Sequence, residues 1–274
     1  MLKSRLTSFG GISVIFLAIL SFILLAGRNV LDVNEEKELS GAKDKWVQIF
    51  NGKNLKNWTV KIKGYPFGDN WKNTFVVDDG VLKVDYAGYK NFDNKFGHIF
   101  YKHPYSNYRL KLQYRFTGEQ VPGGPGWAIR NSGVMIHCQD PKTMEIDQDF
   151  PVSLEVQLLG GVEEGVHRAT GNLCTPGTHV EMDKKLVTKH CINSSSSTYY
   201  GDQWVDMEIL VMNDSLISHH INGKEVISYN KPVIGGNNNP MKEKDGQVLK
   251  GGYISLQSES HPVEFKNIQL MKLN

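Results

Sequence analysis

Short runs in which apolar and polar residues alternate recur along this chain, and they restrict its fold more than any other feature. In 108–116 every second residue is apolar: Tyr108, Leu110, Leu112, Tyr114 and Phe116. Successive side chains of a strand point to opposite faces, so this pattern predicts a strand with one buried and one solvated face. Similar runs occupy 75–84, 152–158, 204–212, 216–229 and 253–259. With Asp-Gly and Asn-Gly turns and no helical periodicity after residue 27, they predict an all-β antiparallel sandwich or jelly roll.

The N-terminal segment differs in kind from the rest of the chain. Lys3 and Arg5 precede an apolar run from about Gly10 to Gly27. This is the layout of a secretory signal peptide or of a membrane anchor, and both interpretations remain open for 1–27. Residues 28–45 are polar and predict a tether, and 46–274 predict a single domain. We therefore expect an exported chain, periplasmic, anchored in the inner membrane or extracellular.

Charge and cysteine content narrow the function further. The net charge of +2, with no basic block, gives no reason to expect a nucleic-acid partner. Cys174 and Cys191 bracket a loop, and in an exported chain they predict a disulfide. Cys138 lies on the apolar phase of its strand and is predicted to be a buried free thiol. The long loops 117–132 and 161–203 are of the kind that carries function.

Three predicted strands carry polar residues on the face opposite their apolar one. Residues 153–157 place Glu155 and Gln157 there, and 131–137 place Asn131 and His137 there. In 253–259 the same phase holds Tyr253, Gln257 and Glu259. Carboxylate, amide and imidazole groups beside aromatic faces are typical of a sugar site. A sheet face open to water would show similar residues, and that alternative remains open.

Several segments resemble, in order, one known family. They are "WVQIFNGKNLKNWTV" (46–60), "FVVDDGVLKV" (75–84), "YRLKLQYRF" with "NSGV" (108–134), "LEVQLLGG" (154–161), "NGKEV" (222–226) and "GGYISLQSESHPVEFKNIQLMKL" (251–273). Together they are similar to the 3-keto-disaccharide hydrolase domain family. The resemblance implies a concanavalin-like β-sandwich exported by bacteria. It also implies cleavage of glycosides whose glucose is oxidised at C3.

That activity sets chemical requirements on a site. A C3 ketone acidifies the hydrogen on C2, so a base there could drive β-elimination of the C1 substituent, followed by hydration; direct hydrolysis is the other route. We predict Glu155 as the base and His137 as the acid or second base. A divalent metal bound by His137, Glu155 or Glu259 could polarise the ketone, although no spacing indicates one. The predicted substrate-binding residues are Arg130, Asn131, Gln157, Trp71, Trp127, Tyr253, Gln257 and Glu259.

Three alternatives to this activity remain. The chain could be a non-catalytic carbohydrate-binding module of the bacterial envelope, since a fold does not fix a function. It could be a purely structural envelope protein, in which case Glu155 would face solvent. It could also be an ordinary retaining glycosidase, for which Glu155 and Glu259 are the available carboxylate pair.

Overall fold

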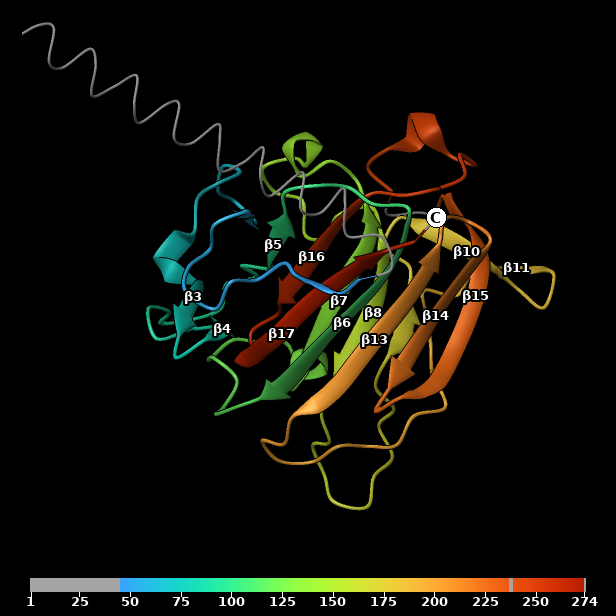
Figure 1. Cartoon of the computed structure of the whole chain (residues 1–274). Helices are drawn as coiled ribbons and strands as arrows, with labels where there is room; N and C mark the ends of the chain where they lie inside the picture. Colours follow the sequence, from blue (N-terminus) through green and yellow to red (C-terminus); the bar gives the residue numbers. More distant parts are fainter. Residues whose placement is uncertain (1–44, 237–238, 274) are drawn as a thin grey trace, which may run out of the picture. The chain divides into compact units, whose positions relative to one another are not determined.

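The computed structural model describes residues 45–236 and 239–273, and within these residues it is an antiparallel β-sandwich (Figure 1). The described part holds no α-helix, only the short 3-10 segments η1 (Trp71–Asn73), η2 (Gly126–Ala128), η3 (Pro141–Thr143) and η4 (Lys242–Lys244). The all-β prediction is confirmed. No helix in the described ranges is long and apolar enough to cross a membrane. The predicted signal or anchor (1–27) and all but the last residue of the tether (28–45) lie outside the described residues and stay predictions.

The larger sheet has the strand order β11-β10-β15-β14-β13-β6-β17-β4-β3, with β1 paired to β17. Its strands are β1 (Val47–Gln48), β3 (Phe75–Asp78), β4 (Val81–Val84), β6 (Asn107–Phe116), β10 (Thr178–Met182), β11 (Lys185–Val187), β13 (Val205–Met212), β14 (Leu216–Ile221), β15 (Lys224–Ile234) and β17 (Val263–Lys272). Strand β6 alternates as predicted, and its outward Arg109 and Arg115 pair with Glu208 and Glu264 of neighbouring strands. The outer face of this sheet is therefore the solvated one.

The smaller sheet, behind β6, β13 and β17 in the view of Figure 1, has the order β12-β9-β8-β7-β16-β5-β2. Its strands are β2 (Trp58–Ile62), β5 (Gly97–Tyr101), β7 (Asn131–Cys138), β8 (Leu154–Leu159), β9 (Asn172–Cys174), β12 (Cys191–Ile192) and β16 (Tyr253–Ser258). Cys174 and Cys191 are directly paired in register and form the predicted disulfide between β9 and β12.

The smaller sheet is buried on both faces. Leu154, Val156 and Leu158 of β8 are fully buried on the face that meets the core. Truncating Leu154 or Leu158 to Ala would cost about 2–5 kcal/mol. The other face carries the polar phase of β8, yet all residues of β7 are buried as well. A sheet face open to water would not show this, so loops must cover the polar face.

A β-bulge in β7 changes which side chains reach that face. Ser255 pairs with Met135 but Tyr253 pairs with Cys138, so β7 has one extra residue between them. His137 takes a positive φ of 52° there. Gly252 lies opposite, where an added Cβ would stand 2.5 Å from the His137 backbone. The bulge reverses the alternation, so the sides predicted for His137 and Cys138 are exchanged.

Candidate functional site

A cavity of about 430 Å³ lies against the polar face of the smaller sheet. Its volume is within the range of about 300–1,000 Å³ found for ligand pockets. Strands β7, β8 and β9 form its floor and loops form its walls. It is lined by Trp127, Asn131, Phe150, Glu155, Gln157, Leu159, Arg168, Cys174, Pro176, His190, Cys191 and Glu259. Five of the predicted site residues therefore meet in one place: Trp127, Asn131, Glu155, Gln157 and Glu259.

Glu155 is held in the middle of the floor by its strand neighbours. It pairs in register with Met135 of β7 on one side and with Cys174 of β9 on the other. Gly133 leaves the space that its carboxyl group occupies, because a Cβ there would lie 2.7 Å from Glu155 Oε1 and 3.0 Å from Gln257 Oε1. Only glycine at 133 lets these two polar groups approach each other across β7.

Glu259, which follows β16, completes a pair of buried carboxyl groups with Glu155. The two side chains are 7% and 3% exposed, and neither has an ion-pair partner in the described part of the chain. Burial raises the pKa of Glu155 to about 8. Burial, and then the charge of Glu155, raise the pKa of Glu259 well above its ordinary value. Two carboxyl groups that share a low-dielectric site do not ionise together, so at least one holds a proton near neutral pH, and Glu155 becomes a carboxylate as the pH rises toward about 8.

Other polar atoms on the floor also lack partners. Both amide atoms of Gln257, Oδ1 of Asn131 and Oε2 of Glu259 are buried without a hydrogen bond to any described residue. The Nε2 atom of His98, which is paired in register with Gln257, is also buried without a hydrogen bond to any described residue. Burial lowers the pKa of His98 to about 3. Each unpaired buried polar group costs about 1–3 kcal/mol, and of these residues Asn131 and Glu259 line the cavity, so a ligand there could supply hydrogen bonds that the described residues do not.

Arg168 fixes the wall of the cavity above β7. Its guanidinium Nη1 donates to the carbonyl oxygens of Ile129 and Gly160, both at 2.7 Å. These bonds hold the segment before β7, where Trp127 stacks on Phe96 with ring centroids 5.9 Å apart. Trp127 is 54% exposed, so its other ring face is free to receive a sugar ring.

The prediction that His137 lies beside Glu155 is wrong. Because of the bulge, His137 turns toward the other sheet, and its Nε2 donates to the Asn213 carbonyl in the β13–β14 turn at 3.0 Å. Burial lowers its pKa to about 4, so it is neutral at pH 7. Cys138 instead packs with Met135 and Phe100 on the polar-face side, where it is a buried free thiol as predicted.

Four further predicted residues lie outside the cavity lining. Tyr253 belongs with His137 to a different cavity of about 290 Å³. Trp71 lies in η1, the segment before β3, and its ring stacks on that of Tyr65. Arg130 turns away to bind the Gly201 carbonyl and Asp202. Gln257 does not line the cavity surface, but it lies behind Gly133, next to Glu155.

The residues proposed for a metal do not fit one. His137 is separated from Glu155 and Glu259, and the described residues contain no group of three or more His, Cys, Asp or Glu side chains placed to hold a metal ion. The loop 140–150 also carries two acidic residues, Asp147 and Asp149, but Asp149 pairs with Lys63 at 2.5 Å.

Three residues that were not predicted for the site also line the cavity, and they come from loops: Phe150, Arg168 and His190. Strand alternation reports only strand residues, so it gave no signal for them. The one hint was the length of the 161–203 segment, which supplies Arg168, His190 and both cysteines of the disulfide.

Comparison with known proteins bears on the family and on the fold. The family model of the "3-keto-alpha-glucoside-1,2-lyase-like domain" matches residues 45–271. A "putative glycosyl hydrolase" of Parabacteroides distasonis has a similar structure, at 21% identity and a TM-score of 0.53, over 84% of this chain and 100% of that one. A Bacillus subtilis protein of unknown function with a galectin-like fold matches at 12% identity and a TM-score of 0.50, over 83% of this chain and 94% of that one. Comparison with curated proteins yields no match. The structural similarities show the fold, a lectin-like β-sandwich.

Proposed function

The chain belongs to the family of 3-keto-alpha-glucoside-1,2-lyase-like domains, and on that premise we propose that it cleaves 3-keto-glycosides by β-elimination at the Glu155–Glu259 site. The observation that carries the proposal is the pair of buried carboxyl groups in the cavity floor. Both have raised pKa values, and neither is neutralised by a cation of the described residues. Such a pair can supply a base and an acid at the same pH.

The two carboxyl groups would take different roles. The charge of Glu155 raises the pKa of Glu259, so Glu155 ionises first and Glu259 keeps its proton. Glu155 as carboxylate would remove the proton from C2 of a 3-keto-glucoside. The electron pair of that C–H bond forms the C1–C2 double bond as the C1–O bond breaks. Glu259 would then give its proton to the departing oxygen. Water adding across the double bond afterwards completes a net hydrolysis.

The other groups at the floor suit the rest of the sugar. The negative charge that develops on the C3 oxygen needs hydrogen-bond donors, and the side-chain amide of Gln157, which lines the cavity, can supply one. Asn131 and Gln157 line the cavity and can bind ring hydroxyls. Trp127 offers the apolar ring face that sugars stack upon.

The test uses a chromogenic 3-keto-α-glucoside and the matching unoxidised glucoside. We expect release of the chromophore from the keto substrate only. Glu155→Gln should lower kcat/KM by about 10²- to 10⁴-fold, the usual contribution of a general base. Glu225→Gln, the same change on an exposed strand residue of the larger sheet, is the control and should leave the rate unaltered.

A second measurement separates elimination from direct hydrolysis. In D₂O, elimination followed by hydration places deuterium at C2 of the product, whereas direct hydrolysis leaves hydrogen there. Product NMR, with substrate incubated without protein as the control, distinguishes the two. Full activity in Glu155→Gln would refute the assigned base. Sugar affinity without turnover would instead support the alternative of a carbohydrate-binding module.

We further propose that the chain works outside the cytoplasm, as its N-terminal segment predicts. The Cys174–Cys191 disulfide supports this, since such bonds persist in oxidising compartments. Expression with and without residues 1–27, followed by cell fractionation, tests it. Equal cytoplasmic recovery of both forms would contradict export.

A further inference from the structure

The cavity of the carboxyl pair is lined by one titratable side chain that the proposed reaction does not use. Besides Glu155 and Glu259, the ionisable residues of the lining are Arg168 and His190, since the two lining cysteines are joined in a disulfide. Arginine is not deprotonated in proteins, and Arg168 is engaged with carbonyl oxygens of the wall. Of the described lining residues outside the carboxyl pair, His190 is therefore the one that can take up and release a proton near neutral pH.

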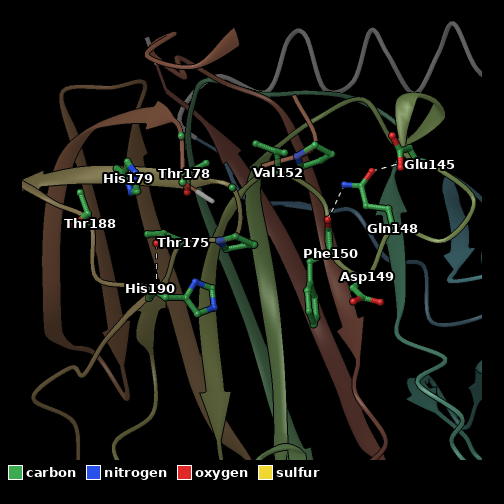
Figure 2. Close-up of a pocket in the computed structure, with 15 residues that line it drawn as sticks. Glu145, Gln148, Asp149, Phe150, Val152, Thr175, Thr178, His179, Thr188 and His190 are labelled. Carbon is green, nitrogen blue, oxygen red and sulfur yellow. Dashed lines mark hydrogen bonds between the residues drawn. The ribbon is translucent and has the colours of Figure 1, made fainter. Parts of the chain in front are cut away.

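His190 lies where two cavities meet. A second cavity, of about 570 Å³, adjoins the first, and Phe150 and His190 are among the residues that line both (Figure 2). In Figure 2 the rings of these two residues point toward the same end of the second cavity. His190 is exposed to solvent, whereas both carboxyl groups of the first cavity are buried. The His190 ring is thus in contact with bulk water and with the interior of the cavity that holds Glu155 and Glu259.

The chain fixes the backbone of His190 and leaves its ring free. The His190 carbonyl oxygen accepts hydrogen bonds from the Thr175 amide at 2.8 Å and from the Thr175 hydroxyl at 3.1 Å. The next residue, Cys191, is joined by the disulfide to Cys174, which is the register partner of Glu155 on β9. Neither ring nitrogen of His190 bonds to a described residue. The position of His190 relative to Glu155 is therefore set by covalent and hydrogen bonds, while both ring nitrogens are available to water.

A buried carboxyl pair that moves protons needs a route to solvent. In the proposed elimination Glu155 gains the C2 proton and Glu259 loses its own. If the alkene leaves before water adds, one proton must then leave Glu155 and another must reach Glu259. His98 cannot serve, because it does not line the cavity and burial lowers its pKa to about 3. Direct transfer from Glu155 to Glu259 is the other possible route, and it would make His190 dispensable.

Resting on the proposed function, we propose that His190 is the proton shuttle of this site and carries protons between the buried carboxyl pair and solvent. The cavity of about 430 Å³ has room for several water molecules that can link the groups. Protonated Glu155 gives its proton through such water to one ring nitrogen of His190, and the ring then releases a proton to solvent. The reverse transfer returns a proton to Glu259. One proton leaves and one enters, so the charge of the site is restored, and no bond to the sugar involves His190.

The experiment follows hydrogen exchange at C2 of a compound that cannot be cleaved. The compound 3-keto-1,5-anhydroglucitol has the C3 ketone and the C2 hydrogen but no leaving group on C1. In D₂O, Glu155 removes this hydrogen, and deuterium returns to C2 only if Glu155 has meanwhile exchanged its proton with solvent. Proton NMR measures the rate at which the C2 signal disappears. Incubations without protein and with Glu155→Gln give the background rate.

We expect His190→Ala to slow this exchange by about 10²-fold, the lower end of the usual contribution of a proton-transfer group. Added imidazole should restore much of the rate, because the missing ring leaves room for it at an exposed position, and Glu155→Gln with imidazole corrects for its own catalysis. Lys189→Ala is the matched control, since Lys189 is equally exposed and lines neither cavity, and it should exchange at the unmodified rate. Calorimetry should give the same affinity for the compound, within about threefold, in every variant at 189 and 190, because a shuttle does not bind the sugar.

Three results would overturn the shuttle while leaving the proposed function intact. One is an exchange rate in His190→Ala within about threefold of the unmodified chain, which would show that the carboxyl pair exchanges its protons unaided. Another is a loss of affinity in His190→Ala as large as the loss of rate, which would assign His190 to sugar binding. The third is a slowed rate that imidazole does not raise. Absence of exchange in the unmodified chain is a different result, because it would refute a base at C2 and thus the proposed function together with this inference.

Discussion

Replacing Gly133 by Ala tests whether the carboxyl geometry at the floor of the cavity matters for function. Gly133 lies between Glu155 and Gln257, and a methyl group there would stand 2.7 Å from Glu155 Oε1 and 2.8 Å from its Cγ. Ordinary van der Waals contact begins near 3.4 Å. Since the Cγ is as close as the oxygen, rotating the carboxyl group alone does not relieve the contact. The whole end of the side chain must move.

The size of the effect follows from that displacement. Restoring ordinary contact requires a shift of about 0.7 Å, and misplacing a reacting group by about 1 Å costs about 10²-fold in rate. We therefore expect kcat/KM on a 3-keto-α-glucoside to fall by about 10²-fold. Crowding a packed site costs about 1–3 kcal/mol of stability, which leaves the chain folded at 25 °C.

The measurement pairs steady-state kinetics with thermal unfolding of the same preparation. Gly126→Ala is the matched control, because a Cβ at Gly126 meets nothing within 4 Å, and it should change neither activity nor Tm by much. In Gly133→Ala with Glu155→Asp, the shorter side chain vacates the crowded position, so the Tm should recover while activity stays low. Two results would refute the reasoning. One is activity in Gly133→Ala within about threefold of the unmodified chain, which a misplaced base does not allow. The other is a double variant whose stability losses simply add, which would show that the two groups do not touch.

Three further expectations concern acid–base state, disulfide and bulge. The ligand-free chain should lose stability as pH rises from about 6.5 to about 8, because burial raises the pKa of Glu155 and Glu259 and the folded state keeps protons that the unfolded chain has released. Below about pH 6.5 the lowered pKa values of the buried His98 and His137 act in the opposite sense, since the unfolded chain protonates these rings and the folded chain does not. Scanning calorimetry should show the fall in Tm above pH 6.5, and a slope in that window that stays unaltered in Glu155→Gln would contradict it. Reducing the Cys174–Cys191 disulfide, which closes a loop of 17 residues, should cost about 3 kcal/mol in urea unfolding, while the Cys174→Ala, Cys191→Ala double variant should show no response to reductant. The variant His137→Asn should keep kcat/KM within about threefold, because the His137 ring binds the Asn213 carbonyl and lies away from the cavity, and because asparagine tolerates the positive φ of the bulge. A loss of about 10²-fold would instead return His137 to the catalytic site.

The alternation of apolar and polar residues predicted the strands and the face of the sheet on which each strand side chain lies. The phase of β8 placed Glu155 and Gln157 on one face, and the phase of β16 placed Gln257 and Glu259 on the matching face. The repeat does not say whether such a face is wet or covered. That depends on loops folding back over it, which is a tertiary property. The family resemblance supplied the substrate class that periodicity could not.

The errors arose where local geometry breaks the repeat. One extra residue in β7 reverses the alternation, and this moved His137 away from the site. The only local sign was Gly252, whose missing side chain makes room for the bulge, and a glycine in a strand has several other uses. Arg168 and His190 come from a loop whose path is fixed by hydrogen bonds to distant carbonyl oxygens and by the disulfide. No repeat in the sequence records such contacts.

The site divides its functions between two kinds of chain segment. The carboxyl pair belongs to a strand and to the end of another, whereas Pro176 and His190 in the cavity wall come from the span closed by Cys174 and Cys191. A span tied at both ends can change in length and composition without altering the register of the strands beneath it. Substrate range and chemistry could therefore diverge independently among relatives. Exchanging the tied span between two family members should change substrate preference, with the acid–base pair left in place.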